Sequence, residues 1–151
     1  MATPVSHVYT DDLVTIEASQ ECAVPGYLVL RLRPPDASLP GLDPTTAGRL
    51  GAMLAAAARA IELAVGAERV YVLSFCEVEP QLHFHLFPRT RWLLDAFRAA
   101  TGAGLGPPSG PALFEWARAT FPPGSVLPPG VPAAGDAAAR LRELLAPGAI
   151  R

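Results

Sequence analysis

Two histidines one residue apart, His83 and His85, are the residues of this chain best suited to chemistry. They lie in the segment EVEPQLHFHLFPRT, residues 77–90, where apolar and polar residues alternate. Such alternation predicts a β-strand whose successive side chains point to opposite faces. One face is expected to carry Gln81, His83 and His85. The other is expected to carry Leu82, Phe84 and Leu86. The apolar side would pack on a core, and the imidazoles would point to an open face of the sheet.

A neutral imidazole suits nucleophilic chemistry on phosphorus. Its pKa is about 6.5, and its two ring nitrogens are chemically distinct. One nitrogen can attack an α-phosphate and form a phosphoramidate while a hydrogen bond holds the other. Such a transfer also needs a good leaving group and donors for the phosphate oxygens. His83 would be the nucleophile, with His85 and Gln81 on either side as hydrogen-bond partners.

Two other interpretations of the histidine pair stay open. His-x-His on a strand is a common half-site for zinc or iron, but it needs a third ligand. The candidate third ligands are Cys76, Glu77, Glu79 and the distant His7, and none has a signature spacing. Alternatively, the imidazoles are surface groups on a solvated face of the sheet.

The elements around the histidines predict an α+β fold with a mostly antiparallel five-stranded sheet and one main helix on its face. The predicted strands lie within residues 5–18 (two short strands around a turn), 24–35, 69–75 and 82–88. The segment 69–75 is continuously apolar, which predicts a central strand. The main helix lies within residues 42–68, with Asp43 as its N-cap and Gly66 as its terminator. Short helical pieces follow within 92–100, 111–121 and 135–148.

Composition limits the partners and the compartment. The net charge is −2, without the basic excess typical of nucleic-acid-binding proteins. No apolar run is long enough to span a bilayer, and the first residues lack the features of a signal peptide, so we expect a cytoplasmic protein with no membrane partner. The two cysteines, Cys22 and Cys76, are expected to be reduced.

The segment QLHFHLFPR resembles the motif of the histidine triad (HIT) family, in which three histidines alternate with apolar residues, commonly before Pro-Arg. The resemblance extends through most of residues 7–91, in one consistent order. It implies a HIT-like domain over 1–100, usually a homodimer. The many Gly and Pro residues that follow predict an extension over 101–151 whose short helices pack on the same domain.

The resemblance also implies the activity and the site. HIT proteins act as hydrolases or transferases on nucleotides such as dinucleoside polyphosphates or nucleoside phosphoramidates. His83 would form the covalent nucleotidyl intermediate, while His85 and Gln81 would complete the catalytic set. Substrate contacts are expected from Tyr27, Glu77 and Arg89, and no metal or cofactor is expected. Further possible phosphate contacts are Arg31, Arg33 and Arg91.

Three departures from the family pattern keep alternatives open. Gln81 replaces the first histidine, and an amide cannot carry the proton of a relay. Tyr27 stands where the third strand often carries histidine. The connection CEVEP replaces a longer Gly-rich, phosphate-holding segment and brings Glu77 and Glu79, which would repel a polyphosphate. A nucleotide-binding or regulatory protein with little turnover is therefore the first alternative, and a His-x-His metal site is the second.

Overall fold

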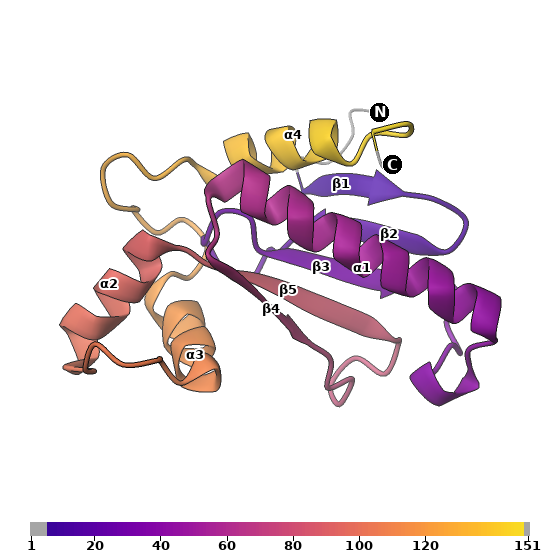
Figure 1. Cartoon of the computed structure of the whole chain (residues 1–151), viewed down its shortest axis with the longest axis horizontal. Coiled ribbons are helices and arrows are strands. Elements are labelled where there is room, and N and C mark those ends of the chain that lie inside the picture. The colour runs from indigo at the N-terminus through magenta and orange to yellow at the C-terminus, as the bar shows by residue number, and fades with distance from the viewer. Residues whose placement is uncertain (1–5, 150–151) are drawn as a thin grey trace.

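A computed structural model describes residues 6–149 of the chain (Figure 1). Its centre is a five-stranded sheet in the order β1-β2-β3-β5-β4, and every neighbouring pair of strands is antiparallel. The strands are β1 (His7–Thr10), β2 (Val14–Ala18), β3 (Leu28–Leu32), β4 (Arg69–Leu73) and β5 (His83–Arg89). With one long helix on a face of this sheet, the predicted α+β fold is confirmed.

The main helix, α1 (Pro44–Val65), begins and ends at the expected residues. The Asp43 carboxylate accepts a hydrogen bond from the Thr46 amide at 3.0 Å, and Gly66 ends the helix in the left-handed conformation, with φ of 65°. Leu50 and Ile61 lie on the buried stripe of the helix and pack on the sheet. The same core contains Leu82, just before β5, and Phe84 and Leu86 of β5, and their burial confirms the predicted inward face.

The prediction that residues 69–75 form a central strand is wrong. β4 lies at an edge of the sheet and pairs only with β5. Its sequence is continuously apolar because side chains on both of its faces meet a core. Val70 packs against the core beneath α1, while Tyr71 and Leu73 pack against a second core on the opposite face. A continuous apolar run therefore indicates that side chains on both faces of a strand meet a core. It does not indicate that the strand is central in the sheet.

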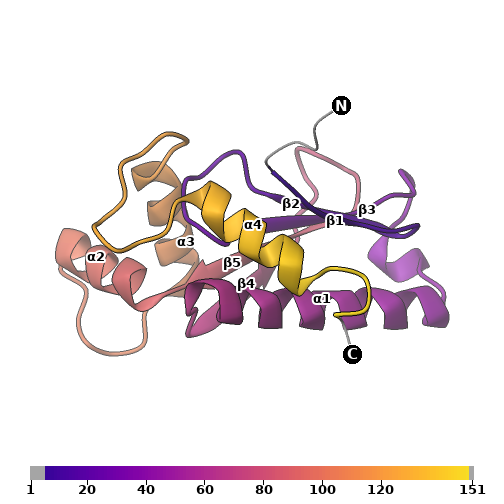
Figure 2. The same cartoon turned by 90° about the horizontal axis from the view of Figure 1, so that it is seen from above.

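The C-terminal helices cover both sides of the sheet. Helices α2 (Arg91–Thr101) and α3 (Gly110–Thr120) lie together at one end of the molecule, and α4 (Ala134–Leu144) runs alongside α1 near β1 (Figures 1 and 2). Leu113 and Phe114 of α3 pack on Phe87, on the face opposite α1. Helices α2 and α3 cover this face at one end of the molecule, and the histidines lie on a part of the face that these helices leave open (Figure 1).

The start of β3 packs closely against the end of α1. Gly26 has a φ of +86°, and a Cβ at this position would lie 3.0 Å from both terminal methyl carbons of Val65. The conformation and the space therefore both call for glycine. The next residue, Tyr27, is fully buried in the second core, beside Phe87 and Phe114.

Candidate active site

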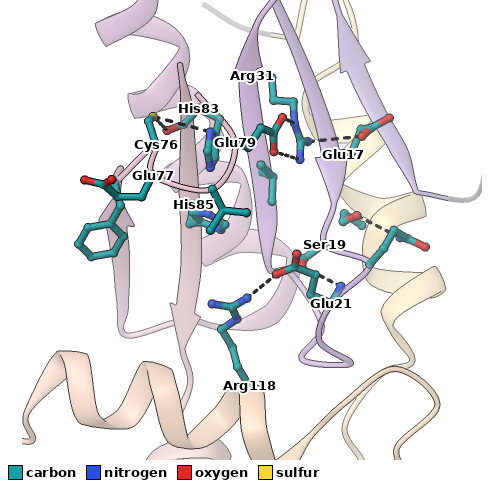
Figure 3. A pocket seen from close by; sticks show the side chains of 15 residues that line it. Glu17, Ser19, Glu21, Arg31, Cys76, Glu77, Glu79, His83, His85 and Arg118 are labelled. Carbon is teal, nitrogen blue, oxygen red and sulfur yellow. Dashed lines mark hydrogen bonds and ion pairs between the residues drawn. The ribbon is translucent and has the colours of Figure 1, made fainter. Parts of the chain in front are cut away.

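The two histidines lie side by side on the face opposite α1. Pairing of β3 with β5 places His83 across from Arg31 and His85 across from Val29. His83 is buried, with 7% of its surface exposed, and His85 is half-buried. Their ring centroids are 5.1 Å apart, and both line one cavity of about 420 Å³ (Figure 3).

His83 is held in one orientation by the main chain. Its Nδ1 lies 2.8 Å from the Gln81 carbonyl oxygen. Because a carbonyl only accepts, Nδ1 carries the proton and donates, which leaves the lone pair of the neutral ring on Nε2. The Ser74 hydroxyl donates to the His83 carbonyl at 2.7 Å, and the Cys76 Sγ lies 3.7 Å from Nδ1. These contacts give a buried imidazole with a defined tautomer.

His85 is paired with a buried phenol. The Tyr27 hydroxyl lies 2.7 Å from the His85 Nδ1. Burial raises the pKa of Tyr27 to about 12, so the phenol keeps its proton at neutral pH. Burial, reinforced by the neighbouring His83, lowers the pKa of His85. His85 is therefore a neutral imidazole at neutral pH.

The charged wall of the cavity is mainly acidic. Its ionisable side chains, besides the histidines and Cys76, are Glu17, Glu21, Glu77, Glu79, Arg31 and Arg118. Both arginines already have carboxylate partners (Figure 3). Arg31 donates to both Glu79 oxygens, at 2.9 and 3.3 Å, and the same contact lowers the pKa of Glu79. Arg118 pairs with Glu21 and lies over the Phe114 ring, 5.3 Å from its centroid.

Among the predicted catalytic residues, the Gln81 side chain points away from the histidines, contrary to expectation. The strand begins at His83, and the Gln81 amide donates to the Leu32 carbonyl at 2.6 Å instead of lining the cavity. Its own carbonyl, however, is the partner of His83 Nδ1. Gln81 thus reaches the site through its main chain.

The predicted substrate contacts separate into two places. Tyr27 contacts His85, and Glu77 lines the cavity. Arg89 lies six residues beyond His83 on β5, which is about 20 Å at the usual rise of a strand. It pairs instead with Glu68, and the packed rings of Phe87 and Phe114 lie between it and the histidines. Arg33 bonds the Asp11 carbonyl and lies outside the cavity as well.

Three ionisable residues of the cavity were not expected from the sequence: Glu17, Glu21 and Arg118. Arg118 and Glu21 are 97 positions apart and meet only because α3 packs across the sheet. No short-range sequence pattern predicts such a pair. Glu17 could have been found, since the register of the predicted antiparallel pair β2–β3 places it across from Val29, beside Arg31.

By sequence, neither a protein-family model nor a curated protein matches the chain. By structure, the chain is similar to a Hit-like protein involved in cell-cycle regulation from Bartonella henselae, with 18% identity, a TM-score of 0.56, and coverage of 95% of this chain and 88% of that one. It is also similar to a histidine triad protein from Bradyrhizobium japonicum, with 20% identity, a TM-score of 0.58, and coverage of 91% and 87%. This chain has the histidine triad fold.

A third structural neighbour also has the histidine triad fold. A zinc-bound histidine triad family protein from Mycobacterium smegmatis is 16% identical, with a TM-score of 0.55 and coverage of 93% of this chain and 84% of that one. In residues 6–149 of the present chain, no three His, Cys, Asp or Glu side chains are grouped as a metal site requires. None of the helices in this range could cross a membrane.

Proposed function

We propose that the chain is a histidine triad hydrolase or nucleotidyl transferase that attacks the α-phosphate of a nucleotide through His83. The observation that carries this proposal is the 2.8 Å hydrogen bond from His83 Nδ1 to the Gln81 carbonyl. It leaves the unprotonated Nε2 as the nucleophilic nitrogen of a ring that lines the cavity.

The reaction proceeds in two displacements. His83 Nε2 forms a bond to phosphorus while the bond from phosphorus to the leaving oxygen or nitrogen breaks, and the leaving group takes up a proton. The ring becomes cationic in this step, and the Gln81 carbonyl stabilises it by accepting from Nδ1. Water, or another acceptor, then attacks phosphorus, loses a proton, and releases the nucleoside monophosphate or its ester with His83 restored.

His85 would be the donor to the phosphate. The Tyr27 phenol, which keeps its proton, donates to His85 Nδ1. The remaining proton of the neutral ring is then on Nε2, where it can donate to a phosphoryl oxygen. In this arrangement Tyr27 positions the proton that the histidine often found at this place on the third strand of the family would otherwise help to place.

Within the nucleotide class, the charges favour a nucleoside phosphoramidate over a dinucleoside polyphosphate. The cavity wall carries four glutamates and two arginines, and both arginines are already paired. A polyphosphate would bring several negative charges next to Glu77 and Glu79, whereas a phosphoramidate brings one.

The alternative of a nucleotide binder with little turnover rests on the Arg31–Glu79 pair. Glu79 occupies both the Nε and an Nη of the guanidinium, so the phosphate would lack a free cation from β3. Such a protein would bind a nucleoside monophosphate without transferring it.

Release of nucleoside monophosphate from a fluorogenic adenosine phosphoramidate tests the proposal. Turnover by the wild type, its loss in His83→Ala and its retention in the matched control His7→Ala are expected. A wild type that is inactive on phosphoramidates and dinucleoside polyphosphates, yet melts at a higher temperature with adenosine monophosphate, would establish the binder instead. Inactivity with no thermal shift would reject both.

We also propose that the protein is a homodimer. The outer edge of β4 is unpaired within the described chain, and Val72 and Phe75 near it are exposed at 49% and 72%. Exposed strand edges are ready to pair with another strand. Light scattering on a sizing column tests this proposal, since a mass near 15.8 kDa would identify a monomer.

A further inference from the structure

A second cavity lies at the other end of β5, between the sheet and α2. Its volume is about 630 Å³, and its charged wall consists of Glu68, Arg69, Arg89, Arg91 and Arg98. We name it the arginine cavity after the last four. Phe87 and Phe114, packed edge to face at 5.2 Å, separate it from the histidines. No role in the proposed reaction accounts for it.

The arginine cavity concentrates positive charge. It holds four of the twelve arginines of a chain that has no lysine and a net charge of −2. One carboxylate, from Glu68, faces these four guanidinium groups, which leaves a local charge of +3. Like charges repel, so an arrangement of this kind is stabilised when an anion binds.

The guanidinium groups are held in place without being neutralised. The Glu68 carboxylate is shared between Arg89, at 3.2 Å, and Arg91, at 2.6 Å. Arg98 donates through Nη2 to the carbonyls of Leu105 and Gly106, at 3.1 and 3.0 Å, while its Nε is buried with no hydrogen-bond partner. A buried donor without a partner is costly. The two carbonyl contacts hold Arg98 at the cavity wall, and no carboxylate within residues 6–149 neutralises its charge there.

Arg69 completes the cavity from the edge strand. It is exposed, and its Nη1 donates only to the carbonyl of Glu68. Among the described residues, therefore, neither Arg69 nor Arg98 pairs with a carboxylate. Two guanidinium groups with fixed main-chain anchors can face a ligand without breaking an ion pair.

We propose that the arginine cavity binds a phosphate dianion carried by a small molecule, at a site separate from the histidines. Guanidinium groups match the oxygens of a phosphate in a bidentate geometry, and the bonds are charge-assisted. A dianion lowers the local charge of the cavity from +3 to +1, whereas a single carboxylate ligand would leave +2. The positive charge is confined to one cavity and does not form an extended stripe, so it suits a compact ligand better than a nucleic acid.

The test is a titration of the full-length protein with inorganic phosphate at pH 8, against sodium chloride of equal ionic strength, followed through the arginine Nε–H resonances and the melting temperature. Phosphate is expected to raise the melting temperature beyond the chloride control and to move the Arg98 Nε–H resonance. The double variant Arg69→Gln/Arg91→Gln replaces two exposed side chains and should weaken binding on the order of tenfold or more.

Two controls make the outcome decisive. Arg59→Gln removes an exposed arginine of α1, outside the cavity, and His83→Ala alters the other site; both should bind phosphate as the wild type does. Equal effects of phosphate and chloride, unchanged binding in the double variant, or loss of binding in His83→Ala would each overturn the proposal. If Arg69→Gln/Arg91→Gln melts below the wild type without ligand, the single variant Arg69→Gln replaces it, with weaker binding expected.

Discussion

The two ends of β5 carry opposite electrostatics. At its start, His83 and His85 face a cavity with four glutamates and two arginines, whereas Arg89 at its end faces a cavity with four arginines and one glutamate. In the first, every arginine is paired with a carboxylate; in the second, two are anchored to main-chain carbonyls. The comparison teaches that a cluster of positive charge and the proposed reactive centre need not coincide in this fold. The proposed nucleophile lies where the imidazole is held, and the arginines without a carboxylate partner lie at the other end of the strand.

The largest effect is expected from His83→Ala, which should lower phosphoramidate turnover by at least about a thousandfold, because the covalent step is lost. Arg69→Gln/Arg91→Gln should leave turnover unchanged within about twofold, because its charges lie beyond Phe87. Steady-state kinetics of both variants decide whether the two cavities act separately. A comparable loss of turnover in the arginine variant would mean that they are coupled.

The next largest effect is expected from removing the Phe87 ring, which lies between the two cavities. Phe87 is fully buried and contacts Tyr27, Tyr71 and Phe114. Phe87→Ala should reduce the free energy of unfolding by about 3–5 kcal/mol through lost burial and a new cavity. Urea denaturation measures the loss. Val126→Ala, at a side chain that is 95% exposed and far from the β4 edge in sequence, is the control and should stay within about 0.5 kcal/mol of the wild type.

Tyr27→Phe tests the proton on His85. The variant keeps the ring and removes the hydroxyl 2.7 Å from Nδ1, so turnover should fall about tenfold, the equivalent of one hydrogen bond of about 1.4 kcal/mol. The pH profile separates this role from a packing role. The His85 proton would be free to occupy either nitrogen, and the acidic limb of kcat should move. An unchanged profile with reduced stability would assign Tyr27 to packing alone.

Glu79→Gln should change affinity in the opposite direction. The substitution breaks the charged contact with Arg31 and frees a guanidinium for phosphate, so adenosine monophosphate should bind a few-fold more tightly at low salt. Isothermal titration at two salt concentrations measures the effect. Glu62→Gln, on the exposed side of α1, is the control. Weaker binding in Glu79→Gln would indicate that the carboxylate itself contacts the ligand.

The smallest effect concerns stability against pH. Burial lowers the pKa of His85 below its unfolded value of about 6.5, so the unfolded chain binds this proton more readily. His85 therefore contributes stability at and above neutral pH that is lost as the pH falls below about 6.5. Melting temperatures from pH 7.5 to 5 should fall less steeply in His85→Gln than in the wild type. Parallel curves would contradict a buried neutral imidazole.

Features set by short-range chemistry could be predicted from the sequence. The alternation around His83 and His85, the Asp43 cap and the Gly66 terminator each depend on a few neighbouring residues, and all appear as expected. Features set by packing could not be predicted. The edge position of β4 depends on which helices cover it, and the Arg118–Glu21 pair depends on where α3 lies. The division of the chain at residue 100 stays a prediction, although α3 and α4 share buried cores with the sheet.

Arg89 and Gln81 illustrate a further limit of the sequence. Both stand at motif positions, but a motif records order along the chain and not direction in space. A strand spreads its residues by about 3.3 Å each, so Arg89 ends far from His83. Gln81 lies before the start of the strand. Its side-chain amide donates to the Leu32 carbonyl, while its main-chain carbonyl accepts from His83 Nδ1.

Gly26 gives the site an unusual sensitivity to mutation. A side chain at this position would displace the Val65 methyl groups by a few tenths of an ångström and would strain the backbone, because L residues rarely adopt a φ of +86°. Tyr27 follows directly, and through its hydroxyl the displacement would reach His85. In a library that varies every position, Gly26 should therefore tolerate almost no replacement, and the few folded survivors should lose turnover before they lose stability. A residue with no side chain would thus rank among the strongest determinants of catalytic precision.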